Sequence, residues 1–193
     1  MTQREVLFQV LDALERLEIP HMIVGSFASN YWGRPRTTHD ADILIEMPAS
    51  KAAALALSLE GSFYAPAEAI RDAIAEGDQF NVIHLDEAFK VDLWLRQDTA
   101  YDRERFARRR RVTMLGRKVW LSSAEDTILI KLLWKRDQPE QSRQLQDAIE
   151  VYETQAPSLD DAYLDRWAAA LGLTDLLASV RSEAAMPPGE AVT

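Results

Sequence analysis

The sequence predicts an α+β protein in which a mixed β-sheet is flanked by helices and followed by a helical C-terminal portion. Three observations predict this class. Apolar segments of strand length alternate with amphipathic segments up to residue 121, the chain beyond residue 122 has only helical patterns, and no glycine-rich dinucleotide or Walker motif occurs. We expect an α/β core over residues 1–121, a helical region packed on it over 122–185, and a disordered tail over 186–193.

The core is expected to begin with an amphipathic helix over residues 4–18. Apolar residues recur there at helical spacing, and Pro20 helps to end the helix. A strand, a short helix, a second strand and an alanine-rich helix are expected next, over residues 21–24, 27–32, 40–47 and 50–60. Ser50 is the expected N-cap of the last of these helices.

The remaining elements follow from alternation and turn residues. We expect a helix over 67–76 stopped by Gly77, two strands over 80–85 and 89–95, and a hairpin over 111–121. The second of those strands places Lys90, Asp92, Trp94 and Arg96 on the face opposite to Phe89, Val91, Leu93 and Leu95. Four helices complete the chain, over residues 123–136, 141–154, 159–171 and 173–184.

Composition limits where this chain resides and what it binds. It contains no cysteine, which excludes disulfides and thiolate metal sites and suits a reducing cytoplasm. No apolar run approaches the roughly 18–20 residues of a membrane span, and residues 1–5 lack the apolar part of a signal peptide. We therefore expect a cytoplasmic protein with no membrane partner. The net charge of -9 disfavours indiscriminate nucleic-acid binding.

One segment departs from this acidic character. Between residues 96 and 118, nine arginines and lysines stand against three acidic residues. Two interpretations remain open: a charged helix surface with pairs at i,i+4 spacing, or a surface that receives tRNA or another anionic acceptor.

The segment from Gly25 to Asp42 carries the strongest chemical signal. Gly25 and Ser26 follow a buried strand and open a short helix, where free backbone N–H groups and the helix dipole favour an anion. Asp40 and Asp42 lie two apart on a strand, so both carboxylates lie on one face. This combination predicts a site that binds a phosphate group together with Mg²⁺.

This pattern resembles the signature of the nucleotidyltransferase superfamily, which has the polymerase-beta-like fold. Here the Gly-Ser pair is separated by thirteen residues from Asp40-Ala41-Asp42. The resemblance implies that Gly25 and Ser26 hold the terminal phosphates of an NTP. It also implies that Asp40 and Asp42 bind Mg²⁺ or Mn²⁺, ions that activate the attacking group and stabilise the leaving pyrophosphate.

Three further residues extend this site. A metal pair usually needs a third carboxylate, and Asp92 is the candidate, because strand positions disfavour aspartate. The resemblance implies that Asp92 serves as metal ligand and as base; the alternative is an aspartate on the solvated face of an edge strand. Arg36 and Thr38 complete an Arg-x-Thr-x-Asp-x-Asp pattern. They either contact the triphosphate or fix the loop, and Arg36 also suits a plain surface position.

A second resemblance concerns the helix that begins after Ser122. The chain is similar there to bacterial nucleotidyltransferase-like proteins related to the toxins of abortive-infection, type IV toxin-antitoxin pairs. The resemblance implies that Lys131 contacts nucleotide phosphates, that Asp147 supports the site, and that an antitoxin-like protein is a partner. Lys131 alternatively extends to solvent. The matching positions are Glu125, Asp126, Lys131, Arg143 and Asp147.

These features favour an enzyme that transfers a nucleoside monophosphate from an NTP to an acceptor and releases pyrophosphate. The acceptor is RNA or tRNA, a protein, or a small molecule such as an antibiotic. Two other hypotheses remain: a nucleotide-binding module or partner protein without catalysis, and a structural protein whose paired acids are solvated.

Overall fold

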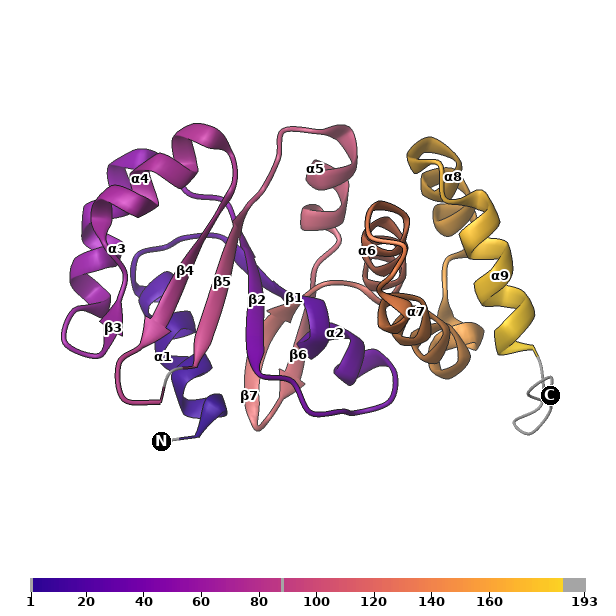
Figure 1. The fold of residues 1–193 in the computed structure, drawn as a ribbon, viewed down its shortest axis with the longest axis horizontal. Coiled ribbons are helices and arrows are strands. Elements are labelled where there is room, and N and C mark those ends of the chain that lie inside the picture. The colour runs from indigo at the N-terminus through magenta and orange to yellow at the C-terminus, as the bar shows by residue number, and fades with distance from the viewer. Residues whose placement is uncertain (1, 88, 186–193) are drawn as a thin grey trace. The chain divides into compact units, whose positions relative to one another are not determined.

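The computed structural model describes residues 2–87 and 89–185 and confirms the predicted α+β class (Figure 1). Its strands are β1 (His21–Val24), β2 (Asp40–Ile45), β3 (Phe63–Tyr64), β4 (Gln79–His84), β5 (Lys90–Leu95), β6 (Arg110–Met114) and β7 (Arg117–Leu121). They form one seven-stranded sheet in the order β3-β4-β5-β2-β1-β7-β6. The sheet is mixed, because β1 runs antiparallel to β2 and parallel to β7, whereas β2 runs parallel to β5.

The helices lie close to the predicted ranges, except that no range was predicted for α5 (Ala100–Ala107). They are α1 (Gln3–Arg16), α2 (Gly25–Trp32), α3 (Ala52–Leu59), α4 (Ala67–Glu76), α5 (Ala100–Ala107), α6 (Ala124–Asp137), α7 (Ser142–Gln155), α8 (Asp161–Leu171) and α9 (Thr174–Ala184), with 3-10 turns at Ala49–Lys51 and Ala156–Ser158. No helix of the described ranges combines the length and the apolar character that a membrane span requires. The tail expected over residues 186–193 lies outside the described residues.

One local expectation was wrong, and one strand was not predicted. Ser50 does not cap a helix, because the chain forms a 3-10 turn from Ala49 and the extended residue before that turn is Pro48, which has no capping hydroxyl. The short edge strand β3 was missed, since two residues are too few to produce an alternating pattern. The predicted end of the helix over 67–76 was correct: Gly77 ends α4 in the left-handed conformation, with φ of 68°.

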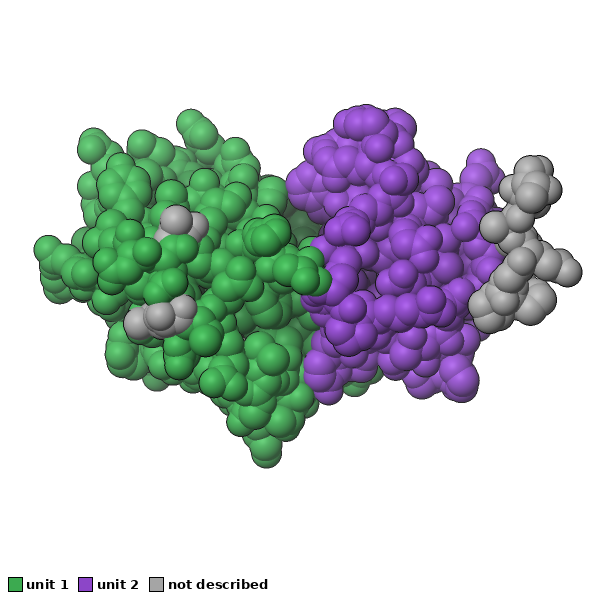
Figure 2. All heavy atoms as spheres, turned by 60° about the horizontal axis from the view of Figure 1, so that its bottom comes forward, with its two compact units in different colours: residues 1–27, 37–121 green, residues 28–36, 122–193 purple. Residues whose placement is uncertain are grey.

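The chain forms two compact units, coloured separately in Figure 2. The first contains residues 1–27 and 37–121, and the second contains residues 28–36 and the chain from residue 122 onward. The division falls inside α2. The short segment 28–36 belongs to the second unit because its contacts are mainly with the C-terminal helices. The domain boundaries stated from the sequence stay a prediction.

The sheet of the first unit has one apolar face and one face that carries acidic side chains. Along β2, Ala41, Ile43 and Ile45 are fully buried. In this unit, helix α3 packs against α1 and α4. Asp40 and Asp42 lie on the opposite face, because alternate residues of a strand point to opposite sides. Part of that face carries an apolar cluster of Met22, Leu44 and Phe106, the last supplied by α5.

The second unit is built from the C-terminal helices. Helix α7 packs against α6 and α9, and α8 also packs against α6 and α9. Helix α6 begins as predicted, since Ser123 adopts an extended backbone and its hydroxyl accepts the Asp126 N–H at 3.1 Å. Completely buried side chains fill the interior of this unit, among them Leu129, Leu132, Val151 and Val180.

Candidate functional site

The turn between β1 and α2 lies directly against a carboxylate. Gly25 has φ of +61° and is the first residue of α2, and Ser26 is the second. A Cβ atom at Gly25 would lie within 3.0 Å of three side-chain atoms of Asp42. Only glycine therefore fits here, for its backbone angle and for its lack of a side chain. The first turn of α2 and the Asp42 carboxylate thus share one small region.

This close approach gives a stability prediction. We expect Gly25→Ala to lower the free energy of unfolding by about 2–4 kcal/mol, because the left-handed angle costs a Cβ-bearing residue and the Asp42 side chain must also move. Gly77→Ala is the matched control, since Gly77 has a similar φ of +68° but only ordinary contacts of 3.4 Å or more. Urea unfolding of both variants measures the difference. Equal losses would show that the Asp42 contact contributes nothing.

The strand register brings the second and third predicted carboxylates together. Strands β2 and β5 are parallel neighbours in which Asp42 pairs with Asp92 and Asp40 pairs with Lys90. Paired residues of adjacent strands point to the same face. Asp40, Asp42 and Asp92 therefore occupy one face of the sheet, next to the β1–α2 turn.

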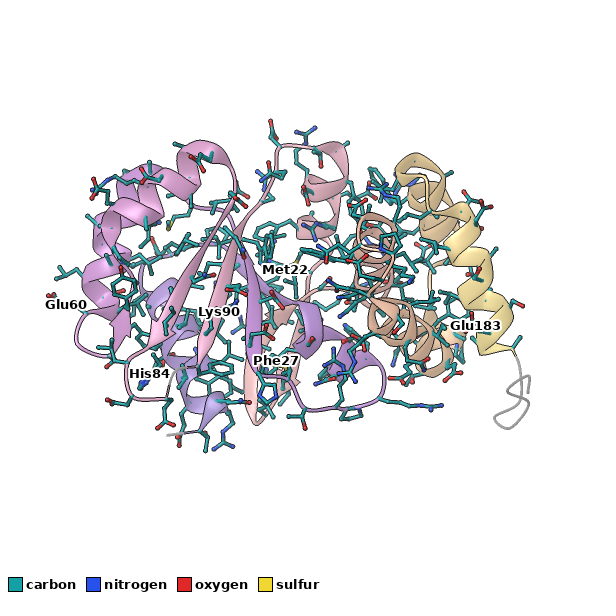
Figure 3. All side chains as sticks on the ribbon, viewed as in Figure 1. Met22, Phe27, Glu60, His84, Lys90 and Glu183 are labelled. Carbon is teal, nitrogen blue, oxygen red and sulfur yellow. The ribbon has the colours of Figure 1, made fainter. Side chains whose placement is uncertain are left out.

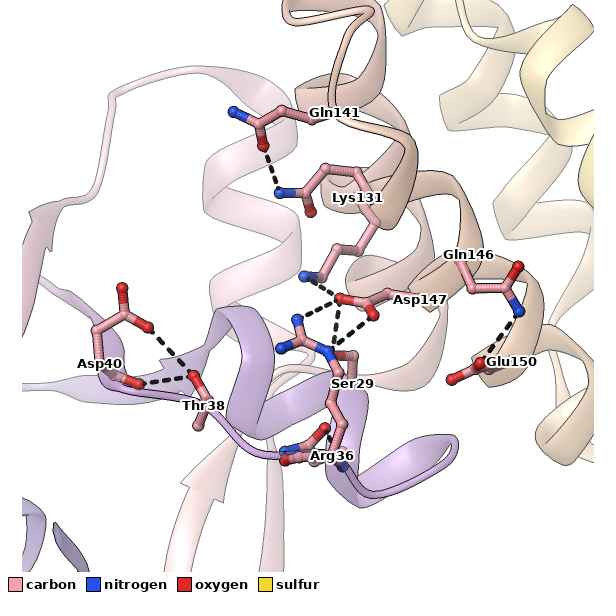
Figure 4. Close-up of polar contacts among 11 residues, drawn as sticks. Ser29, Arg36, Thr38, Asp40, Lys131, Gln141, Gln146, Asp147 and Glu150 are labelled. Atoms are coloured by element: carbon pink, nitrogen blue, oxygen red, sulfur yellow. Dashed lines mark hydrogen bonds and ion pairs between the residues drawn. The ribbon is translucent and has the colours of Figure 1, made fainter.

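Each of these carboxylates already has a polar neighbour. Trp94 Nε1 donates to Asp42 Oδ1 at 3.1 Å, and the Thr38 hydroxyl donates to Asp40 Oδ1 at 3.1 Å (Figure 4). The Lys90 ammonium lies 2.8 Å from Asp92 Oδ2. The other oxygen of Asp92, Oδ1, is buried and has no hydrogen-bond partner. Asp92 thus retains a buried acceptor atom for another group.

Lys90 responds electrostatically to this acidic face. Its hydrogen bond to Asp92 raises the pKa of the Lys90 ammonium, and the charges of Asp92, Asp40 and Asp42 act in the same direction, against a smaller opposing effect of burial. The face therefore contains three carboxylates and one ammonium.

The donor set suits a hard divalent cation, although the ligands are not assembled around one. Carboxylate oxygens are the ligands that Mg²⁺ prefers, and the unpartnered Asp92 Oδ1 is an acceptor that a cation would satisfy. Among the described residues, no group of three histidine, cysteine, aspartate or glutamate side chains is close enough to hold a metal ion. Binding would thus require the carboxylates to turn from their present hydrogen bonds.

The second unit has its own buried ionic cluster. The Asp147 carboxylate accepts from Lys131 Nζ at 2.6 Å and from Arg36 Nε and Nη2 at 3.1 and 2.9 Å (Figure 4). The Ser29 hydroxyl lies 3.5 Å from the same carboxylate. Asp147 and Lys131 are only 4% and 5% exposed. Lys131 therefore does not extend to solvent, and Arg36 is not a free surface residue.

The other residues of the toxin-like pattern have local contacts. Asp126 accepts from the hydroxyls of Ser123 at 2.7 Å and Tyr163 at 2.6 Å. Glu125 accepts the backbone N–H of Asp160 at 3.1 Å. Glu125 and Asp126 therefore connect α6 to the start of α8 and have a structural role. Arg143 is exposed in the first turn of α7.

The Asp147 cluster predicts a pH dependence of stability. Burial alone would raise the pKa of Asp147, but hydrogen bonds from Arg36 and the charge of Lys131 outweigh it, so the pKa lies below its ordinary value of 3.8. A carboxylate with a depressed pKa stabilises the fold above its unfolded pKa, and this contribution is lost as the pH falls through the folded pKa. We expect the gap in urea midpoint between the wild type and Asp147→Asn to narrow from pH 5 to about pH 2. A gap independent of pH would contradict this.

Two neighbours of the carboxylates were not among the predicted site residues. Lys90 and Trp94 contact Asp92 and Asp42, respectively. The sequence pattern could have identified Lys90 and Trp94, because the alternation along residues 89–95 places them on the same strand face as Asp92. Ser29 was also missed, because its contact with Asp147 spans 118 residues and no local pattern indicates it.

Comparison with known proteins identifies the fold. No protein-family model matches the sequence, and no curated protein matches it. Several solved structures do resemble it. A crystal structure of ANT(2'')-Ia in complex with adenylyl-2''-tobramycin is 18% identical, with a TM-score of 0.52, over 96% of this chain and 100% of that chain. The lincosamide antibiotic adenylyltransferase LnuA, with lincomycin bound, is 13% identical, with a TM-score of 0.52, over 78% and 96%.

A third solved structure shows the same likeness. An antigenic nucleotidyltransferase-like protein from Paracoccidioides brasiliensis is 16% identical, with a TM-score of 0.53, over 91% of each chain. At these identities the likeness concerns the fold. The chain has the nucleotidyltransferase fold, as the Gly-Ser and Asp-x-Asp pattern predicted.

Proposed function

We propose that this chain is a metal-dependent nucleotidyltransferase, which moves a nucleoside monophosphate from an NTP to an acceptor and releases pyrophosphate. One observation carries the proposal: the Gly25 turn lies against Asp42, and Asp42 is paired in register with Asp92. A helix start of the kind that binds phosphate therefore lies next to two carboxylates on neighbouring strands of one sheet.

The chain's own residues divide the reaction between them. Backbone N–H groups in the first turn of α2, with Ser26, bind the terminal phosphates. Asp40, Asp42 and Asp92 would hold Mg²⁺ or Mn²⁺, which supplies charge neutralisation for the phosphates when bound. We assign Asp92, whose Oδ1 is buried and has no hydrogen-bond partner, as the base that takes the proton of the acceptor hydroxyl. The acceptor oxygen forms a bond to the α-phosphorus, the bond to the β-phosphate oxygen breaks, and pyrophosphate leaves.

The second unit contains two cations that share one carboxylate. Lys131 and Arg36 present two cations to the single carboxylate of Asp147, which leaves one positive charge in excess. We assign Lys131 and Arg36 to nucleotide phosphate, with Asp147 as the anion that orients both. Thr38 is assigned to positioning Asp40, given its hydrogen bond to that carboxylate.

We propose a small-molecule hydroxyl as the acceptor. Two of the structures with this fold are named for antibiotic adenylation, one of them holding an adenylylated tobramycin. A polyanionic acceptor such as tRNA is the second candidate, favoured by the arginines near β6. Arg109 lies over the rings of Phe106 and Trp120, at 4.6 and 4.9 Å, and Arg111 lies 5.2 Å from Trp120. The toxin-antitoxin relation and an antitoxin-like partner stay predictions of the sequence resemblance.

The proposed function is tested by measuring the transfer of a radioactive label from each NTP to an acceptor. The full chain is incubated with α-³²P-labelled NTPs and Mg²⁺ or Mn²⁺, with aminoglycosides, lincosamides or tRNA as acceptors, and labelled product and pyrophosphate are measured. Transfer to any acceptor supports the proposal, and the acceptor decides between the two candidates. Metal-dependent NTP binding by calorimetry without transfer would instead indicate a non-catalytic nucleotide-binding module. Absence of both would overturn the proposal.

A further inference from the structure

We propose that the β6–β7 hairpin binds the phosphate backbone of a single-stranded nucleic acid. The binding surface consists of Arg109, Arg111 and Lys118 around Trp120, and we call it the hairpin surface. The inference goes beyond the proposed function, because a strand can bind here without nucleotidyl transfer, whichever acceptor the enzyme uses.

The basic segment between residues 96 and 118 contains cations of two kinds. On and next to α5, Arg103 pairs with Asp98 and Arg105 pairs with Asp102, and on β7 Arg117 pairs with two acids of α1. Within residues 2–87 and 89–185, by contrast, no carboxylate pairs with any of the three cations of the hairpin surface. The interpretation of the segment as a charged helix surface with ion pairs therefore applies to α5 but not to the hairpin.

The strand register brings the unpaired cations to one side of the hairpin. Arg111 of β6 pairs across the ladder with Trp120 of β7, and Thr113 pairs with Lys118. Paired residues point to the same face of a sheet, and so do residues two apart on one strand. The exposed side chains of Arg111 and Lys118 therefore share a face with Trp120, at the edge of the sheet that β6 forms.

The indole of Trp120 positions two of these cations. The guanidinium carbons of Arg109 and Arg111 lie 4.9 and 5.2 Å from the centre of its ring system. Trp120 packs in turn against the apolar cluster that contains Met22, which is labelled in Figure 3. Both arginines are thus held by an aromatic side chain rather than by carboxylates, so their charge is not neutralised.

Arg109 retains a donor that the protein does not use. Its Nη1 donates to the Phe106 carbonyl at 2.7 Å, whereas its Nε is buried and has no hydrogen-bond partner among the described residues. Burial lowers the pKa of Arg109, and the charge of Glu46, which itself pairs with Arg96, opposes this only in part. A phosphate oxygen that accepts from Nε would stabilise the buried guanidinium.

A strand with unpaired bases fits this surface better than an acidic peptide does. Arginine forks match phosphate and carboxylate alike, but guanidinium planes and an indole also offer flat surfaces on which bases stack. Stacking accepts every base, so we expect little sequence preference. The net charge of -9 does not prevent local binding, because exposed charges beyond about 10 Å are largely screened at about 0.1 M salt.

The test is the fluorescence anisotropy of labelled oligo(U) RNA and oligo(dT) DNA, titrated with the full chain at several salt concentrations without NTP or divalent metal. We expect Arg111→Gln and Lys118→Gln each to weaken binding about fivefold to tenfold at about 50 mM salt. Each should also reduce the slope of log K against log salt by about 0.7, the value for one phosphate contact on a single strand. Arg103→Gln is the matched control, since it removes the same charge from an exposed ion pair of α5, and its affinity should stay within about twofold of that of the wild type.

The two probes identify the source of the phosphates, because tighter binding of one strand selects RNA or DNA and equal binding indicates the backbone alone. The inference is overturned if neither strand binds, if Arg103→Gln weakens binding as much as Arg111→Gln, or if polyglutamate displaces the probe as well as an unlabelled strand does. Tighter binding of a duplex would refute the single-strand assignment. Self-association of the Arg111 and Lys118 variants, with no strand bound by the wild type, would show that these cations only protect the edge strand β6. Since the assay contains neither NTP nor metal, its result is independent of the proposed transfer reaction.

Discussion

Asp42→Asn is expected to lower kcat/KM for nucleotidyl transfer by about a thousandfold or more, because it removes the central charge that would hold the divalent ion. Asp42 is the most constrained of the three carboxylates. It faces Gly25, pairs with Asp92, and accepts from the Trp94 indole. The amide retains the size of the side chain and an oxygen for Trp94, so the fold should be kept. Initial rates of pyrophosphate release measure the loss.

Glu46→Gln is the matched control. Glu46 directly follows β2 and forms an exposed ion pair with Arg96 at 3.0 Å, so the same chemical change occurs outside the site. We expect its rate to stay within about twofold of the wild-type rate. Circular dichroism establishes that both variants are folded. A folded Asp42→Asn protein with the wild-type rate would remove Asp42 from the mechanism and, with it, the metal assignment.

The parts of this site that depend on local pattern could be predicted from the sequence. The alternation in residues 40–45 and 90–95 correctly placed Asp40 and Asp42 on one face of β2 and Asp92 on the acidic side of β5. Gly25 and Ser26 were expected at a helix start, and α2 begins there. The spacing of apolar residues and the residues that form turns can both be identified within a short stretch of one sequence.

Pairing between distant segments could not be predicted in the same way. The alternation shows which way Asp42 and Asp92 point, but not that β2 and β5 are parallel neighbours with those two residues opposed. That register is decided by burial across the whole sheet. For the same reason, Gly25 was expected to favour a phosphate, whereas its contact with Asp42 was not foreseen.

The Asp147 cluster illustrates the limit most clearly. Arg36, Lys131 and Asp147 were each identified, yet their mutual contacts join positions 111 and 16 residues apart. A lysine among apolar residues has two physical solutions, which are extension to solvent or a buried counter-ion. Only the fold decides between them, and here the counter-ion is Asp147.

Asp147→Ala is expected to lower the free energy of unfolding of the second unit by about 3–5 kcal/mol, since it leaves Lys131 as a buried cation without its carboxylate. Arg36, whose side chain is 23% exposed, can turn toward water, but Lys131 is nearly inaccessible. Urea unfolding gives the size of the loss. Hydrogen exchange of α6 and α7 peptides, followed by mass spectrometry, shows whether the loss is located in that unit.

Glu153→Ala separates this effect from the general loss of an ion pair. Glu153 pairs with Arg34 at 2.9 Å in the same unit, but the arginine side chain is 65% exposed, so the expected cost is about 0–1 kcal/mol. Adding Lys131→Met to Asp147→Ala should recover part of the lost stability, because the stranded charge is then removed as well. If Asp147→Ala costs no more than Glu153→Ala, Lys131 has access to water, and the excess positive charge assigned to nucleotide binding is not held in a buried cluster.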